Sequence, residues 1–184
     1  MSLTHVGHSG PRLLSAPAGA LTRKLSNMDI TREELTDNLN EDLAREYQAV
    51  IAYVTYSQKL KGAQYMAIAA ELETHAREEL QHALTICKQV DYLGGDPTVE
   101  SKPVKTSDEA RDMLRFDLDN ENTTVRNYRE RVRQCEALGE FALAEEIRQI
   151  LVQEQEHQID LATALGEDVP DVGELAGANN KRKK

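Results

Sequence analysis

A pattern of glutamate and histidine residues occurs twice in this chain, at the same spacing. In the first half Glu46 is followed 33 positions later by Glu79, which begins Glu79-Leu-Gln-His82. In the second half Glu121 is followed 33 positions later by Glu154, which begins Glu154-Gln-Glu-His157. Residues three apart on a helix share a face, so each Glu-x-x-His pair presents a carboxylate and an imidazole to one point. Two such pairs and two further carboxylates are the ligand set of a di-iron or di-manganese site in a four-helix bundle.

The predicted site balances its own charge. Four carboxylates neutralise two divalent cations, so the site can be buried without a large uncompensated charge. Oxygen ligands with few imidazoles suit iron(II) and manganese(II), and zinc is also possible. A lone Glu-x-x-His is common on solvated helices, but two at matched spacing are hard to obtain by accident. We predict two metal ions, one held by Glu46 and His82, the other by Glu121 and His157, with Glu79 and Glu154 as bridges.

Two tyrosines repeat in register with the predicted ligands. Tyr53 lies seven positions after Glu46, and Tyr128 lies seven positions after Glu121. Seven residues are about two helical turns, so each phenol is expected near the site as a hydrogen-bonding group. Amphipathic core packing is the alternative role for both. Tyr53 is included among the candidate catalytic residues.

Further side chains flank the two Glu-x-x-His pairs. Glu78 and Gln153 directly precede the predicted bridging glutamates and are expected to orient the histidine of the opposite pair. His75 faces the same side of its helix as the first pair, where an interior or interfacial histidine is expected in preference to an extra ligand. Glu71 and Arg131 are expected on solvated faces.

The composition indicates a soluble, helical protein. The 184 residues carry a net charge of −10, 29% are charged, and the mean hydropathy is −0.58. Aromatic residues make up 4% and there is no tryptophan, which fits helices better than a β-sandwich or barrel. No apolar run approaches the roughly 18 residues that span a bilayer, so no membrane association is predicted. Cys87 and Cys135 give no disulfide framework, and we expect a reducing cytoplasm.

Four amphipathic helices are expected. The first begins at a capping box over residues 31–34 and runs to about Lys61. The second covers about 63–93 and ends at a Gly-Gly-Asp-Pro sequence. The third begins at a second capping box, over residues 106–109, and ends near Gly139. The fourth follows at once and ends at Gly166.

The connections predict an all-α bundle of two antiparallel hairpins. Very short turns join the first helix to the second and the third to the fourth. Between them lie about a dozen residues with Pro97 and Pro103, which reach about 40 Å when extended, the length of the bundle. Residues 1–28 are expected to be a flexible arm, 29–166 the bundle, and 167–184 a flexible tail with a basic end.

From about Leu39 to Leu165 the chain resembles a bacterioferritin-type member of the ferritin-like superfamily. The resemblance is carried by Leu39-Asn-Glu-Asp-Leu-Ala-Arg-Glu46, by Asp117-Leu-x-x-Glu121, and by the two Glu-x-x-His pairs. It implies a ferritin-like four-helix bundle with one long crossover. It also implies a hollow cage of identical subunits that oxidises iron(II) with oxygen or hydrogen peroxide at a di-iron site and stores the ferric mineral.

Two departures from that family modify the expectation. Bacterioferritins bind haem through a Met directly after the first bridging glutamate, and this chain has Leu80 there, so haem is not predicted. Cages of 24 subunits carry a fifth short helix, whereas the fourth helix here is expected to stop at Gly166. A 12-subunit cage of the mini-ferritin kind therefore stands beside the 24-subunit one. The basic end, residues 179–184, is expected to be solvated, with DNA contact as an alternative.

Two other functions remain open from the sequence. A rubrerythrin-like or manganese-catalase-like enzyme would consume peroxide at the same site without storage, although the Cys-x-x-Cys module usual in rubrerythrins is missing from this sequence. A DNA-protecting mini-ferritin would depend on the basic tail.

Overall fold

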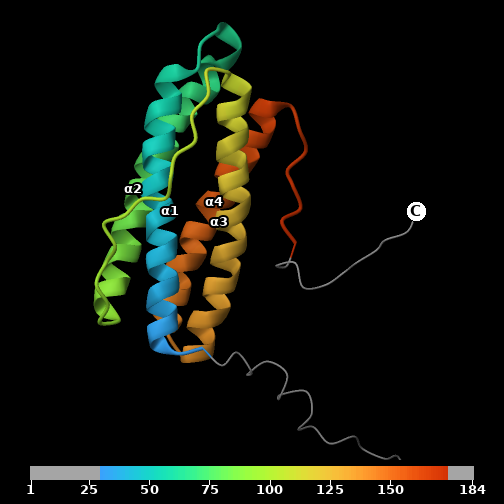
Figure 1. The fold of residues 1–184 in the computed structure, drawn as a ribbon. Coiled ribbons are helices and arrows are strands. Elements are labelled where there is room, and N and C mark those ends of the chain that lie inside the picture. The colour runs from blue at the N-terminus through green and yellow to red at the C-terminus, as the bar shows by residue number, and fades with distance from the viewer. Residues whose placement is uncertain (1–29, 174–184) are drawn as a thin grey trace, which may run out of the picture.

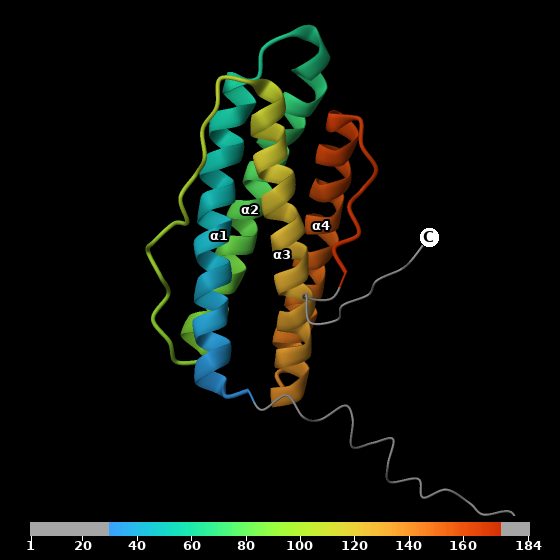
Figure 2. The ribbon, with the colours of Figure 1, turned by 45° about the vertical axis from the view of Figure 1, so that its right-hand side comes forward.

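The structure is a computed structural model that describes residues 30–173, and over this range it is an all-α four-helix bundle (Figures 1 and 2). The elements are α1 (Arg32–Lys59), the short 3₁₀ helix η2 (Ala63–Tyr65), α2 (Met66–Tyr92), α3 (Ala110–Leu138) and α4 (Phe141–Leu165). The predicted helical class and the four helices are confirmed. The predicted arm over residues 1–28 and the basic end of the tail lie outside the described residues.

The first predicted capping box is present at the start of α1. The Thr31 backbone N–H donates to the Glu34 carboxylate over 2.8 Å, and the Glu34 N–H donates to the Thr31 hydroxyl over 3.1 Å. The helix thereby satisfies two of the four donors that its first turn leaves free. At the far ends of α3 and α4, Gly139 and Gly166 adopt φ of 77° and 72°, a left-handed conformation that only glycine takes at low cost.

The second predicted capping box is wrong. Helix α3 begins at Ala110, and Glu109 at its N-cap makes no side-chain capping bond. The hydroxyl of Ser107 accepts from the Glu109 N–H and donates to Asp112. Residues 106–109 therefore belong to the connection before α3 and do not open the helix.

The connection from α2 to α3 is the predicted long crossover, and it runs alongside α1 (Figure 1). Side chains and carbonyl groups of α1 bind it at intervals of about one or two helical turns. The Asn40 amide donates to the Asp96 carbonyl (3.0 Å), and the Ala44 carbonyl accepts from the Lys102 N–H (2.9 Å). Further along, the Gln48 amide donates to the Pro103 carbonyl (2.7 Å). These bonds hold the crossover along α1.

Two apolar clusters fill the bundle, one toward each end. The first contains Leu72, Leu118 and Leu161, and the second contains Leu39, Ile86 and Ile147, all fully buried. The acidic and histidine residues of the repeated pattern lie between the two clusters. A polar layer is thereby held inside a dry interior, where electrostatic interactions are strong.

The first residues of the predicted tail pack on the bundle. Val172 is buried, and the Gln158 amide donates to the Pro170 carbonyl over 3.4 Å. Glu167 forms ion pairs with Arg111 and Arg115. Residues 167–173 therefore contact the bundle, and the flexibility expected of the tail stays a prediction.

None of the helices within residues 30–173 has both the length and the apolar character that crossing a membrane requires.

Candidate metal centre

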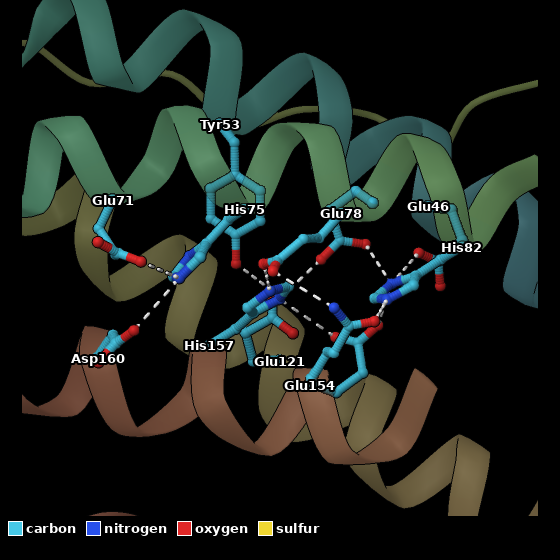
Figure 3. A network of polar contacts seen from close by, with 12 residues as sticks. Glu46, Tyr53, Glu71, His75, Glu78, His82, Glu121, Glu154, His157 and Asp160 are labelled. Atoms are coloured by element: carbon cyan, nitrogen blue, oxygen red, sulfur yellow. Dashed lines mark hydrogen bonds and ion pairs between the residues drawn. The ribbon is translucent and has the colours of Figure 1, made fainter. Parts of the chain in front are cut away.

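The repeated pattern converges at the middle of the bundle (Figure 3). All four helices contribute, and each side chain is at most 2% exposed. The residues are Glu46 from α1, Glu79 and His82 from α2, Glu121 from α3, and Glu154 and His157 from α4. Periodic apolar positions on each helix fix which face turns inward, and the six residues lie on that face.

The six side chains divide into two groups of possible metal ligands. In each group one ligand atom per residue lies within 4.8 Å of the others. Glu79 and Glu154 belong to both groups, which is what bridging carboxylates require. One group adds Glu46 and His82, and the other adds Glu121 and His157. The arrangement has the connectivity expected from the sequence, and the ligand role of each residue stays a prediction.

The distances around His82 suit a shared metal ion. Its Nδ1 lies 3.1 Å from a Glu154 oxygen, 3.4 Å from a Glu46 oxygen and 3.5 Å from a Glu79 oxygen. None of these contacts has hydrogen-bond alignment, since the Nδ1 has no hydrogen-bond partner. Metal–ligand bonds of about 2.1 Å place neighbouring ligand atoms roughly 3.0–3.4 Å apart. Two of the three distances fall within this range and the third is 0.1 Å longer, so the spacing is compatible with a coordination shell.

Buried polar atoms without hydrogen-bond partners concentrate at this point. Such atoms are rare in folded proteins because each costs roughly 1–3 kcal/mol. Among the described residues, every one of the six predicted ligands has at least one: an Oε of Glu46, Glu79, Glu121 and Glu154, and the Nδ1 of His82 and His157. The donor set, four carboxylates and two imidazoles, therefore fits two divalent cations in number, charge and direction.

The outer nitrogen of each histidine is held by a residue from the opposite hairpin. The Nε2 of His82 lies 2.9 Å from the Gln153 carbonyl oxygen, and the Nε2 of His157 lies 2.8 Å from Glu78. The Gln153 amide also donates to Glu78 over 3.3 Å. Acceptors at Nε2 favour the tautomer that leaves the Nδ1 lone pair facing the site. The orienting role expected for Glu78 and Gln153 matches these contacts.

Each of the two tyrosines donates a hydrogen bond to a glutamate from the other half of the repeated pattern. The Tyr53 hydroxyl donates to Glu121, and the Tyr128 hydroxyl donates to Glu46. Each bond occupies one carboxylate oxygen and leaves the other free to bind a cation. Both phenols are fully buried and adjoin the apolar clusters, so they also serve as core residues.

Burial and mutual repulsion shift the acid–base properties of the site. Burial raises the pKa of all four carboxyl groups, and neighbouring carboxylates add to the effect at Glu79, Glu121 and Glu154. Burial alone would lower the pKa of the histidines. The facing carboxylates outweigh it, so the pKa of His82 is raised, and that of His157 is raised to about 9. Divalent cations would displace these protons.

The metal-free protein is therefore expected to lose stability as the pH rises from 6.5 to about 9. Groups with raised pKa values bind more protons in the folded state than in the unfolded state, so their stabilisation disappears as those protons leave. Burial lowers the pKa of His75 to about 3, so this residue makes stability rise with pH between about 3 and its ordinary value of 6.5. Above pH 6.5 it causes no further change. Circular dichroism melts of chelator-treated protein at both ends of this range test the sign. A melting temperature that is flat or rises would contradict it.

Sequence reasoning missed one buried ion pair beside the site. Arg131 was expected on a solvated face, but it is 6% exposed. Its Nε donates to Asp42 over 2.6 Å and its Nη2 over 3.2 Å. The burial of Arg131 could have been expected, because it lies three residues after Tyr128 and shares its helix face.

Asp117 is also buried. One of its oxygens has no hydrogen-bond partner, and burial raises its pKa well above its ordinary value.

Comparisons with known proteins agree with this arrangement. The chain matches the model of the family "Ferritin: Ferritin-like domain" over residues 36–169. It is 26% identical over 132 residues to a protein of Desulfovibrio desulfuricans named bacterioferritin, covering 71% of this chain and 74% of that one. It is 24% identical over 142 residues to a bacterioferritin of Brucella melitensis biotype 1, covering 73% and 88%.

A solved structure shares the fold. It is described as a ferritin-like, diiron-carboxylate protein from Bacillus anthracis str. Ames. The two superimpose with a TM-score of 0.70 at 30% sequence identity, covering 73% of this chain and 96% of the other.

Proposed function

Because this chain belongs to the ferritin family, through its ferritin-like domain, we propose that it is a ferroxidase that oxidises iron(II) and stores the product in an oligomeric cage. The proposed ligands are the six residues of the repeated pattern, with Glu79 and Glu154 as bridges. Iron(II) is both the substrate and the metal that fits the donor set. The two bacterioferritins and the diiron-carboxylate protein are the relatives that support the proposal.

The observation that carries the proposal is the set of unpartnered ligand atoms inside the bundle. A folded chain does not keep four carboxyl groups and two imidazoles buried at one point without a compensating role, because their desolvation is costly. Two divalent cations would compensate the charge of the four carboxylates. The proposed site is also shielded from bulk water, which limits side reactions at the metal ions.

Iron(II) bound at this site supplies one electron from each of two ions. With oxygen as oxidant, two iron(II) ions, one oxygen molecule and two protons give two iron(III) ions and one hydrogen peroxide. With peroxide as oxidant, two iron(II) ions, one peroxide and two protons give two iron(III) ions and two water molecules. In this proposal the histidine Nδ1 atoms bind, Glu78 and Gln153 orient the imidazoles, and Tyr53 and Tyr128 each hold one single carboxylate in place.

The cage and its setting belong to the same proposal. We propose a homo-oligomer of 12 or 24 subunits in the cytoplasm, without haem, because Leu80 stands where bacterioferritins have the haem-binding Met. Leu80 is exposed on α2, where it is available to a neighbouring subunit, and a leucine side chain offers no ligand atom to a haem iron.

Aerobic iron(II) oxidation tests the proposal on the assembled, metal-free protein. Ferric product is followed optically, and the iron that stays with the protein after gel filtration is counted per chain. The expected result is rapid oxidation with hundreds of iron atoms retained in an assembly of cage size. Oxygen and peroxide as alternative oxidants are compared in the same experiment.

Saturation at two metal ions per chain would contradict storage. Peroxide consumption with manganese and without a mineral would then favour the rubrerythrin-like or manganese-catalase-like function. Failure to oxidise iron(II) at all would overturn the ferroxidase proposal.

A further inference from the structure

The two halves of the site are related by a shift of 75 positions in the sequence, but one buried residue beside the site does not follow this repeat. The shift maps Glu46 to Glu121 and His82 to His157. The same shift maps His75 to Ile150, so the two ends of the site differ. His75 is 1% exposed and adjoins the end formed by Glu121 and His157, with its ring stacked on that of His157 at 4.0 Å between centroids.

The end formed by Glu46 and His82 is closed. Ile150 occupies the position equivalent to His75 and belongs to the apolar cluster there. The buried Asp42–Arg131 ion pair lies on the same side, with Arg131 three residues after Tyr128 in the chain. Arrival of metal from this end would have to disrupt a packed core and an ion pair.

The other end has a second cluster of possible ligands that leads to the surface. The Nε2 of His75 lies 3.3 Å from an Asp160 oxygen and 4.0 Å from a Glu71 oxygen (Figure 3). The ligand atoms of these three residues lie within 4.8 Å of one another. Glu71 on α2 and Asp160 on α4 have side chains 49% and 42% exposed, while that of His75 is 2% exposed. The cluster therefore runs from two exposed carboxylates to a buried imidazole that stacks on His157.

The two carboxylates of this cluster adjoin open space at the surface, and His75 is not among the residues that line it. Glu71 and Asp160 line a surface pocket of about 280 Å³ between α2 and α4. One imidazole and two carboxylates form a set that divalent first-row metals accept, with the remaining positions filled by water. The Nε2 of His75 faces both Glu71 and Asp160 and is the ring atom that would bind the cation.

We propose that Glu71, His75 and Asp160 form a third divalent-cation site that stages metal for the Glu121–His157 end of the dimetal centre. Binding at the third site is independent of the ferroxidase proposal, and only the staging role rests on it. Two carboxylates at the surface attract the cation, and the imidazole holds it one aromatic ring away from His157. Metal exchange is then faster at this end than at the end closed by Arg131.

Zinc binding to the assembled, metal-free protein tests the third site, because Zn²⁺ does not change oxidation state. Bound Zn²⁺ is counted per chain by equilibrium dialysis at increasing free metal. The parent is expected to bind one Zn²⁺ more than the variant Glu71→Gln/Asp160→Asn. Glu146→Gln is the matched control, since Glu146 is the repeat equivalent of Glu71 but faces a helix position occupied by Ile150. It is expected to bind as many Zn²⁺ ions as the parent.

Equal zinc counts in the parent and in Glu71→Gln/Asp160→Asn would overturn the third site. The variant Glu79→Ala/Glu154→Ala separates the two proposals, because it is expected to lose the dimetal ions and to keep the third one. Stopped-flow loading at limiting metal tests the staging role. Glu71→Gln/Asp160→Asn is expected to fill the dimetal centre at least about tenfold more slowly than the parent, with the same final occupancy. An unchanged rate would overturn staging.

Discussion

Replacing Glu79 and Glu154 together by glutamine is expected to slow iron(II) oxidation by more than about a hundredfold. These are the two residues that belong to both ligand groups, so the substitution weakens both metal positions at once. Glutamine keeps the shape of glutamate but removes two of the four negative charges. Two divalent cations would then be left with a net positive charge in a buried site.

The same substitution is expected to stabilise the metal-free protein. Burial and mutual repulsion raise the pKa of both carboxyl groups, so ionising them in the folded state costs free energy. Removing that cost is expected to add about 1–3 kcal/mol to the free energy of unfolding near pH 8, or roughly 3–10 °C in the melting temperature. A substitution that lowers activity while it raises stability indicates that the residues serve function and not the stability of the fold.

Oxidation rates and thermal melts of the same preparations measure both effects. Glu156→Gln is the matched control, because Glu156 lies on α4 between Glu154 and His157 in sequence but is exposed. It is expected to match the parent in both measurements. A Glu79→Gln/Glu154→Gln variant that keeps parental oxidation would show that the chemistry occurs elsewhere.

Replacing Arg131 by methionine is expected to destabilise the protein by about 3–5 kcal/mol. The substitution leaves Asp42, which is 2% exposed, buried without the guanidinium that contacts both of its oxygens. Burial already raises the pKa of Asp42 despite the ion pair, so the carboxyl group has no inexpensive ionised state once Arg131 is gone. For a chain of this size the melting temperature is expected to fall by roughly 10 °C.

Two further variants separate the lost ion pair from lost packing. Asp42→Leu/Arg131→Met removes both charges and is expected to recover most of the stability. Arg129→Met changes a partly exposed arginine on the same helix and is expected to shift the melting temperature by less than about 2 °C. Thermal melts and urea unfolding measure all three variants. An Arg131→Met loss no larger than that of Arg129→Met would mean that Asp42 finds another partner.

The helices and the convergence of the site could be predicted because both depend on local periodicity. Glu46 and Glu121 lie on the same stripes as the apolar residues around them, and the stripe decides which side chains turn inward. Arg131 lies on such a stripe too, but arginine favours the surface, and only the partner Asp42 on another helix makes its burial possible. Sequence spacing carries no information about that pairing.

The beginning of α3 shows the same limit. Residues 106–109 have the composition of a capping box, yet they lie before α3, and the Ser107 carbonyl accepts from Lys59 over 2.7 Å. A local preference of about 1 kcal/mol is small enough for contacts between residues far apart in the chain to override it. Val172 was missed for a related reason, because its burial depends on the shape of the bundle surface.

The division of the ligands between the two hairpins has a mechanical consequence. The α1–α2 hairpin provides Glu46, Glu79 and His82, and the α3–α4 hairpin provides the remaining three, so every ion bound in the arrangement proposed here would cross-link the two. Such a cross-link closes a chain loop in the way that a disulfide does and removes conformational entropy from the unfolded state. Loading with iron would then do more than prepare the site for oxidation, because it would fasten together two halves that are otherwise joined covalently only by the crossover.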